Sequence, residues 1–144
     1  MNRWSWLLMS LDAAGTTGLT PAQLQKVLFL MGQETPHWLG VQDYYRFTPY
    51  NYGPFSKSVY LDAETLAQRG FVNIYVVPGN SFSMYEITPI GAGYAKTLEC
   101  EADARAVRYL KVVVTWAQSL TFSKLVSSIY RKYPAFRVNS VFQD

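Results

Sequence analysis

An amphipathic helix followed at once by a tight β-hairpin constrains the fold of this chain more than any other feature. After residue 55, apolar side chains recur at helical spacing, at Val59, Tyr60, Ala63, Leu66 and Ala67. Gly70 ends this run, as glycine often does just past a last helical turn. The segments FVNIYVV and FSMYEIT then flank the turn sequence PGNS at 78–81, which predicts a hairpin. This order is that of the second half of a winged helix.

An aromatic, proline-broken loop at 44–55 leads into this helix. Its six aromatic residues are Tyr44, Tyr45, Phe47, Tyr50, Tyr52 and Phe55. Because proline disfavours helical geometry in the residue before it, the helix is predicted to start at Pro54 or Phe55, with Ser56 as an alternative N-cap. We expect Phe47, Phe55 and one tyrosine to fill the core. The remaining rings exceed what a solvated loop exposes, and they predict a surface for a partner.

Two further helices are predicted before the loop. The first covers residues 2–13 and is broken by Gly15 and Gly18. Thr20 is then a candidate N-cap, with Pro21 at the first position of a helix over 21–34. A broad apolar stripe predicts that this second helix is central and mostly buried. Its solvent side is expected to carry Gln23, Gln25 and Lys26.

Helical patterns continue after the hairpin. They predict a short helix over 90–98, a longer one over 101–117, and a last helix that Thr121 caps and Pro134 ends. The inner face of the last helix is expected to hold Phe122, Leu125, Val126 and Ile129. The predicted fold class is therefore α+β, a mostly helical, winged-helix-like single domain over 1–144. Residues 1–90 form its helices and hairpin, and residues 91–144 form a C-terminal helical extension.

Composition excludes several classes of protein. Apolar residues make up 49% of the chain and charged residues 16%, which indicates a globular domain rather than a disordered one. No run approaches the roughly 18 uncharged apolar residues of a membrane span. The single cysteine, Cys100, rules out an internal disulfide and a cysteine-based metal cluster, and a reducing cytoplasm is the expected setting.

No catalytic motif is present in the sequence. His37 and Cys100 are its one histidine and one cysteine, and the acidic neighbours of Cys100 disfavour a thiolate. There is neither a GxSxG nucleophile elbow nor a glycine-rich phosphate loop. We therefore expect a protein that is not an enzyme and that carries no metal or cofactor, with a hydrolase built on His37 as the weakest alternative.

Basic residues concentrate towards the C-terminal end. Residues 104–144 hold seven Lys or Arg side chains against the single Asp144, whereas residues 1–90 hold five basic and six acidic ones. A nucleic-acid-binding alternative would use Arg105, Arg108, Lys111, Lys124, Arg131 and Lys132. The helix after the loop carries as many acidic as basic residues, and the hairpin tip has no cation, so DNA readout by that face is disfavoured.

Several segments resemble a known family. LQKVLFLMGQ, the stretch YYRFTPYNYGPFSKSVYLDAETLAQRGFV and the segment YEITPIGAGYA together resemble the Panacea (SocA-like) antitoxin domain and the related YwgA-like bacterial proteins. LVSSIYRKYPAFRVNSVF is similar to the ending of the YwgA-like proteins, and YGPF at 52–55 is the most specific piece. The resemblance implies a cytoplasmic, non-enzymatic module that binds other proteins, as an antitoxin beside a toxin or within a phage-defence locus.

These observations predict a partner-binding face formed by the aromatic loop and the helix after it. Its residues are Tyr44, Tyr45, Tyr50, Tyr52, Phe55, Lys57 and Tyr60. The expected partner is a protein, either a toxin or a defence effector encoded nearby, and no membrane is involved. The alternative function is that of a winged-helix DNA-binding regulator that uses the basic C-terminal segment. The sequence leaves open whether the chain forms a homodimer.

Overall fold

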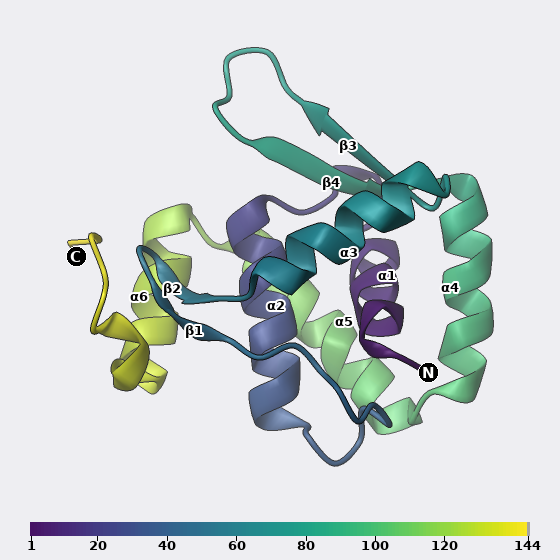
Figure 1. The fold of residues 1–144 in the computed structure, drawn as a ribbon, viewed down its shortest axis with the longest axis horizontal. Coiled ribbons are helices and arrows are strands. Elements are labelled where there is room, and N and C mark those ends of the chain that lie inside the picture. The colour runs from purple at the N-terminus through teal and green to yellow at the C-terminus, as the bar shows by residue number, and fades with distance from the viewer. Residues whose placement is uncertain (144) are drawn as a thin grey trace.

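The computed structural model describes residues 1–143 and has a mixed α+β fold in which helices dominate (Figure 1). The elements in chain order are α1 (Arg3–Ala14), the 3₁₀ turn η1 (Gly15–Thr17), α2 (Pro21–Glu34), β1 (Thr48–Tyr50), β2 (Gly53–Phe55), α3 (Lys57–Gln68), β3 (Val72–Val76), β4 (Ser83–Ile87), α4 (Pro89–Glu101), α5 (Ala104–Ser119), α6 (Phe122–Lys132) and the 3₁₀ turn η2 (Pro134–Arg137). Within these residues, no helix combines the length and the apolar character that crossing a membrane requires.

Local capping explains where the first two helices begin. Asn2 Oδ1 accepts a hydrogen bond from Ser5 N at 3.3 Å, and Ser5 Oγ accepts one from Asn2 N at 3.2 Å. Thr20 and Gln23 make the same reciprocal pair at the start of α2, where Pro21 occupies the first helical position. Each pair satisfies backbone N–H groups that a helix start otherwise leaves without partners. The helices predicted over 2–13 and 21–34 are thus confirmed to within a residue at each end.

The predicted β3–β4 hairpin is present and gains one residue of a third strand. Leu19, between α1 and α2, forms two backbone hydrogen bonds of 2.9 Å with Tyr85 in β4. Gly18 precedes this bridge with φ +70°, and a Cβ there would lie 2.5 Å from the carbonyl oxygen of Tyr85, so the position needs glycine. The bridge ties the base of the hairpin to the α1–α2 connection, while the tip projects away from the body of the molecule (Figure 1).

The aromatic loop contains a second, smaller hairpin that we did not predict. β1 and β2 pair in antiparallel register, and Pro49 faces Pro54. Because proline has no N–H, this pair fits only a position of the ladder without hydrogen bonds. The helix start predicted at Pro54 or Phe55 is wrong, since both residues belong to β2. Ser56, the alternative, immediately precedes α3.

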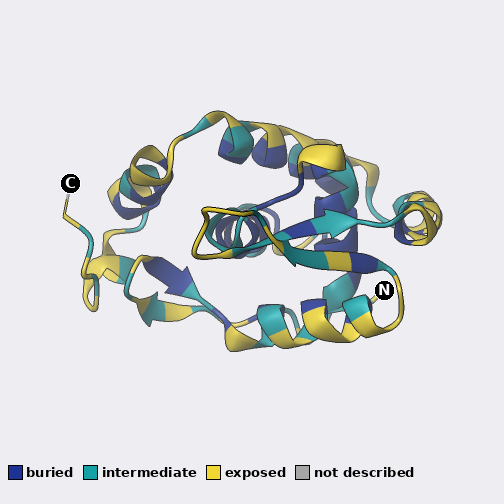
Figure 2. Cartoon of the chain, turned by 90° about the horizontal axis from the view of Figure 1, so that it is seen from above, coloured by how far each residue is buried: buried dark blue, intermediate teal, exposed yellow. Residues whose placement is uncertain are grey.

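A single core runs through both halves of the chain. α1, α2 and α5 pack together at the centre, α4 lies against α1, and α6 lies against α2 (Figure 1). On the outer helices, buried residues face inward and exposed residues face solvent (Figure 2). The buried cluster joins Leu8 and Leu28 from the first half to Val114 and Leu125 from the second. The C-terminal extension is therefore built into the main core.

Three side chains lie on a different side from that predicted. Gln25 and Lys26, expected in solvent, are both buried, because α2 is enclosed by α1, α5, α6 and β2. Phe122, expected on the inner face of α6, is exposed. The inner face of that helix consists of Leu125, Val126, Ile129 and Tyr130. Both errors concern residues whose neighbours come from distant parts of the sequence.

Candidate functional site

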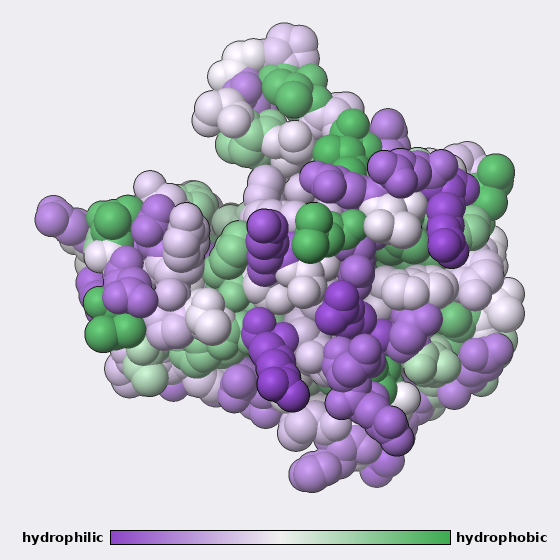
Figure 3. All heavy atoms as spheres, in the orientation of Figure 1, coloured by the Kyte–Doolittle hydropathy of each residue, from purple (hydrophilic) through white to green (hydrophobic). Residues whose placement is uncertain are grey.

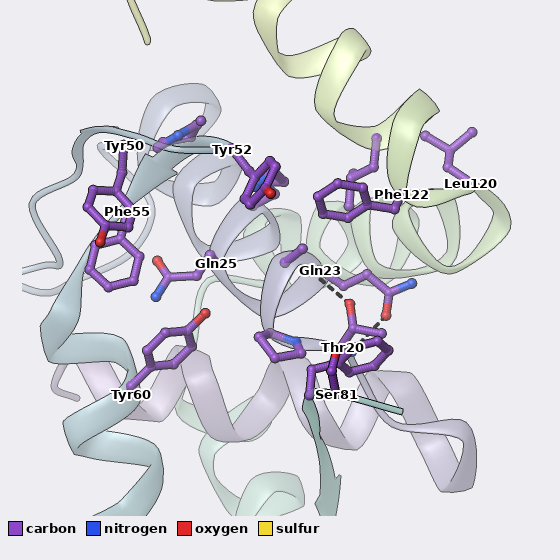
Figure 4. Close-up of a pocket in the computed structure, with 17 residues that line it drawn as sticks. Thr20, Gln23, Gln25, Tyr50, Tyr52, Phe55, Tyr60, Ser81, Leu120 and Phe122 are labelled. Carbon is purple, nitrogen blue, oxygen red and sulfur yellow. Dashed lines mark hydrogen bonds between the residues drawn. The ribbon is translucent and has the colours of Figure 1, made fainter. Parts of the chain in front are cut away.

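A groove of about 730 Å³ lies where four segments meet. Its walls come from the β1–β2 hairpin, the first turns of α2, the tip of the β3–β4 hairpin and the start of α6. Tyr50 and Phe55 stand on one side of the groove and Leu120 and Phe122 on the other (Figure 4). The surface is notched between the projecting hairpin and the C-terminal end of the molecule (Figure 3). The groove is thus open to solvent rather than enclosed.

Aromatic rings form an exposed rim around this groove. Tyr50 is 51% exposed, Tyr52 46%, Phe122 47% and Phe82 40%. Tyr52 packs edge-on against Phe122 with ring centroids 5.2 Å apart, and Tyr50 stacks on Phe55 at 4.9 Å. Neighbouring rings therefore restrain these side chains while much of their surface stays in solvent.

A pair of hydrogen bonds fixes the floor of the groove. Gln25 Nε2 donates to the carbonyl of Ser56, and the backbone N–H of Ser56 donates to Gln25 Oε1, both at 2.9 Å. The amide side chain thereby takes the place of a neighbouring strand and holds α2 against the start of α3. Beside it, Tyr60 stacks on Tyr85, and burial, with a smaller contribution from Tyr85, raises the pKa of Tyr60 to about 12. Its hydroxyl is therefore neutral near pH 7.

Among the residues that the structure describes, Lys26 is the one charged residue that lines the groove. Its side chain is 3% exposed, and burial lowers its pKa from 10.5 to about 8. Its Nζ and Cε each lie 3.7 Å from the point that a Cβ on Gly53 would occupy. The amine therefore sits beneath the turn of the β1–β2 hairpin.

The segment after α6 holds the β1–β2 hairpin in position. Val141 N donates to the carbonyl of Asn51 at 2.9 Å, and Ser140 Oγ contacts the same oxygen at 3.2 Å. Tyr130 OH donates to Ser140 Oγ at 2.7 Å and so links this segment to α6. One wall of the groove thus depends on residues about ninety positions further along the chain.

Two residues of the predicted site belong to the interior instead. Tyr45 is buried, and its hydroxyl donates to Asp62 Oδ2 at 2.7 Å, the same oxygen that Arg3 Nε contacts at 2.9 Å. Tyr44 donates to the carbonyl of Leu28 at 2.5 Å, and burial raises its pKa. Both side chains fasten the long connection to α1, α2 and α3. We therefore correct the predicted face by removing Tyr44 and Tyr45.

The structure brings together only part of the remaining set. Tyr50, Tyr52, Phe55 and Tyr60 all line the groove, whereas the exposed Lys57 is outside its lining. Sequence reasoning missed other lining residues, namely Lys26, Phe82, Leu120 and Phe122. No local pattern signals that these residues meet, because each belongs to a different element or connection.

Several basic residues of the alternative, nucleic-acid-binding site already form ion pairs within the protein. Three of the six form ion pairs: Arg105–Asp103, Lys111–Glu99 and Lys132–Glu34. The hydrogen bonds from Arg105 lower the pKa of Asp103 to about 2, so this carboxylate is charged over the whole neutral range. Arg105 also lies over the ring of Trp38 at 4.4 Å. These contacts reduce the charge that the segment presents to phosphate.

Candidate catalytic groups are scattered. His37 and Cys100 are both exposed, and neither lines the groove. Across residues 1–143, no group of three His, Cys, Asp or Glu side chains is placed to hold a metal ion. The groove itself offers an amine, amides, hydroxyls and aromatic rings, a set suited to recognition.

No protein-family model, characterised protein or solved structure matches this chain in comparisons with known proteins. The groove combines the exposed rings of the rim, the hydrogen-bonded floor and the amine of the buried residue Lys26.

Proposed function

We propose that this chain is a non-enzymatic protein-interaction module, antitoxin-like or associated with phage defence, that binds a partner protein in the aromatic groove. One observation carries the proposal. The rings of Tyr50, Tyr52, Phe82 and Phe122 surround an open groove with 40% to 51% of their surface exposed. Single exposed apolar residues are ordinary on protein surfaces. Several exposed aromatic side chains that surround a concave surface are typical of an interaction site.

The partner is expected to be a macromolecule. A small ligand inside the groove would leave the outer faces of Tyr50 and Phe82 in water, whereas a polypeptide laid across the rim would cover them. Aromatic side chains contribute large contact areas with few rotamers to restrict, which is why they dominate binding energies at interfaces. The partner segment should therefore present apolar side chains to the rim.

The order of elements supports a winged-helix-like core for this module. α1, the Leu19 bridge, α2, α3 and the β3–β4 hairpin follow one another as in a winged helix, with the β1–β2 hairpin inserted between α2 and α3. In this proposal, the YGPF segment at 52–55, the most specific part of the Panacea resemblance, forms β2 and its turn at the edge of the groove. The resemblance and the groove thus point to the same residues.

Binding to the protein encoded by the adjacent gene tests the proposal. Tyr50→Ala combined with Tyr52→Ala should weaken that complex by about 30-fold or more, since loss of central aromatic residues often costs 2 kcal/mol or more. The matched control is Ile90→Ala combined with Val112→Ala, which removes two exposed apolar side chains on α4 and α5 and should leave affinity unchanged. Titration calorimetry and size-exclusion chromatography give the readouts. Equal affinities for the two double variants would remove the groove from the interface.

The DNA-binding alternative has a distinct signature. It requires binding to the chain's own upstream DNA with a steep dependence on salt, because phosphate contacts release counterions. Neutralising Arg105, Arg108 and Lys111 by substitution with Gln should then abolish binding. The acidic residues on α3 and the cation-free hairpin tip give this alternative less support than the groove gives to a protein partner.

A further inference from the structure

The floor of the groove holds a lysine without a partner. Among the described residues, the amine of Lys26 forms no ion pair and no side-chain hydrogen bond. No fully enclosed side-chain N or O atom lacks a partner there, so the Lys26 amine still reaches the solvent of the groove. The acidic residues that form ion pairs are matched to other cations, such as Asp62 to Arg3 and Glu34 to Lys132. A buried ammonium group is costly unless an anion or several acceptors compensate it. The position therefore carries a charge that the chain itself does not satisfy.

The surroundings of Lys26 favour an incoming anion. Among residues 1–143, no acidic side chain lines the groove, so the Lys26 ammonium gives the described lining a formal charge of +1. The amide of Gln25, the nearest polar neighbour in sequence, is hydrogen-bonded to Ser56 and also contacts the hydroxyl of Tyr60. The titratable side chains that line the groove with Lys26 are Tyr50, Tyr52 and Tyr60, and the ring of Tyr130 approaches the same glycine, Gly53. Apolar walls around one cation strengthen its attraction for a carboxylate.

We infer that Lys26 binds the carboxylate of an aspartate or glutamate in the partner protein, and that the residues flanking this acid pack against the aromatic rim. This inference rests on the proposed function, because it names the chemistry that the same groove recognises. An internal acidic residue suits the geometry better than a chain terminus, since rings stand on two opposite sides of the groove (Figure 4). A segment crossing it has apolar contacts available both before and after the acid, through Phe55 on one side and Phe122 on the other.

The inference explains why a polar residue occupies this buried position. In the free protein, desolvation opposes the charge on Lys26, which lowers its pKa. In the complex, a charge-assisted hydrogen bond to a carboxylate compensates that desolvation. The lysine thus discriminates against partners that are merely apolar, because such a partner would cover the ammonium without pairing it.

Lys26→Met is the decisive variant, because methionine keeps the length and removes the charge. Affinity for the protein encoded by the adjacent gene should fall about 10- to 100-fold, the range expected for a charge-assisted hydrogen bond. Lys111→Met, on the exposed side of α5, is the matched control and should bind as the wild type does. A melting curve for each variant confirms that the fold is intact. Unchanged affinity for Lys26→Met would overturn the inference, while a loss of binding in the Tyr50→Ala, Tyr52→Ala variant would leave the proposed function standing.

Titration of Lys26 by NMR with isotope-labelled lysine separates the remaining outcomes. The pKa of its amine should rise when the partner protein binds, because a carboxylate stabilises the ammonium. A fall on binding would mean that an apolar group covers the lysine, and no change would mean that the partner leaves the amine unpaired; either result contradicts the inference. Phenylpropanoate serves as the free-acid probe. If it binds tightly at Lys26 while the partner protein binds equally well to wild type and Lys26→Met, the groove is a small-molecule acid site and the inference fails.

Discussion

Lys26 carries a free-energy cost in the folded protein that depends on pH. Burial lowers its pKa from 10.5 to about 8, whereas the unfolded chain keeps the ordinary value. Between these two pH values the unfolded chain binds more protons than the folded one, so stability rises with pH across this window. Below pH 8 both states are protonated and the full cost remains, which is about 3 kcal/mol at 1.36 kcal/mol per pKa unit.

Lys26→Met should remove this cost. We expect the variant to be more stable than the wild type by about 3 kcal/mol at pH 7, with the difference shrinking towards zero near pH 10.5. Urea unfolding of both proteins at several pH values measures it, and taking the difference cancels the contributions of the tyrosines. Lys111→Met should keep the wild-type pH dependence. If the Lys26→Met protein is less stable than the wild type at pH 7, the lysine stabilises the folded protein, which contradicts the expected cost.

Substitution of Gln25 should destabilise the folded protein, in contrast to substitution of Lys26. Gln25→Leu leaves the buried N–H and C=O of Ser56 without partners, which should cost about 2–4 kcal/mol of unfolding free energy. Gln33→Leu makes the same chemical change at an exposed position of α2 and should shift stability by no more than about 0.5 kcal/mol. Denaturant melts of the two variants provide the measurement. Similar stabilities would show that Ser56 finds other partners when the amide is removed.

The burial of Gln25 and Lys26 could not be predicted from the local sequence pattern. Burying a polar side chain is costly without partners, so a polar residue in a helix is sensibly assigned to the solvent side. The partner of Gln25 is a backbone segment 31 residues later, and nothing near Gln25 in the sequence indicates it. Tyr45 is a similar case, since its hydroxyl bonds to Asp62, 17 residues away.

At the scale of elements, α4 is positioned by one glycine. A Cβ at Gly91 would clash with the carbonyl oxygen of Phe71 and would lie 2.9 Å from Ile87 Cδ1, so this glycine lets the first turn of α4 approach the base of the β3–β4 hairpin. Thr88 N donates to the same carbonyl at 3.2 Å and Thr88 Oγ1 caps the helix. The close approach fixes how α4 leaves the hairpin.

Two glycine-to-alanine substitutions in α4 should therefore change the stability of the protein in opposite directions. Gly91→Ala should destabilise the protein by about 1–3 kcal/mol, because the helix must move away from the hairpin. Gly93→Ala, with nothing within 4 Å of its Cβ, should stabilise by up to about 1 kcal/mol through helix propensity. Thermal unfolding followed by circular dichroism compares them directly. A stabilising Gly91→Ala would show that α4 is free to shift at little cost.

The elements that could be predicted are those with signals inside themselves. Thr20 with Pro21 marks the start of α2, and Gly70 marks the end of α3 in the same direct way. The β1–β2 hairpin has no such signal, because each strand has three residues and each contains a proline. It is held from outside, by the backbone of Val141 among others. For the same reason Tyr50, Tyr52, Phe55 and Tyr60 could be predicted as site residues, whereas Phe82, Phe122 and the groove itself could not.

At the scale of the whole molecule, the two halves of the chain share one core. α5 packs between α1 and α2, so residues of the C-terminal half complete the burial of the N-terminal helices. Three consecutive valines in α5 show the arrangement. Val112 is 63% exposed, whereas Val113 and Val114 are buried in the shared core. Truncating a buried valine of α5 should therefore also lower the stability of helices in the N-terminal half.

Val114→Ala should destabilise both halves together. Loss of two methyl groups from this fully buried position should lower the unfolding free energy by about 1–3 kcal/mol. Since α1 and α5 belong to one cooperative unit, the most protected amides of α1 should lose as much protection in native-state hydrogen exchange as those of α5. Val112→Ala, two residues away on the solvent side, should leave both helices unchanged. If Val114→Ala weakened α5 while α1 kept its full protection, residues 1–90 would form an independent unit, and the wall that α6 contributes to the groove would be able to open separately from the rest.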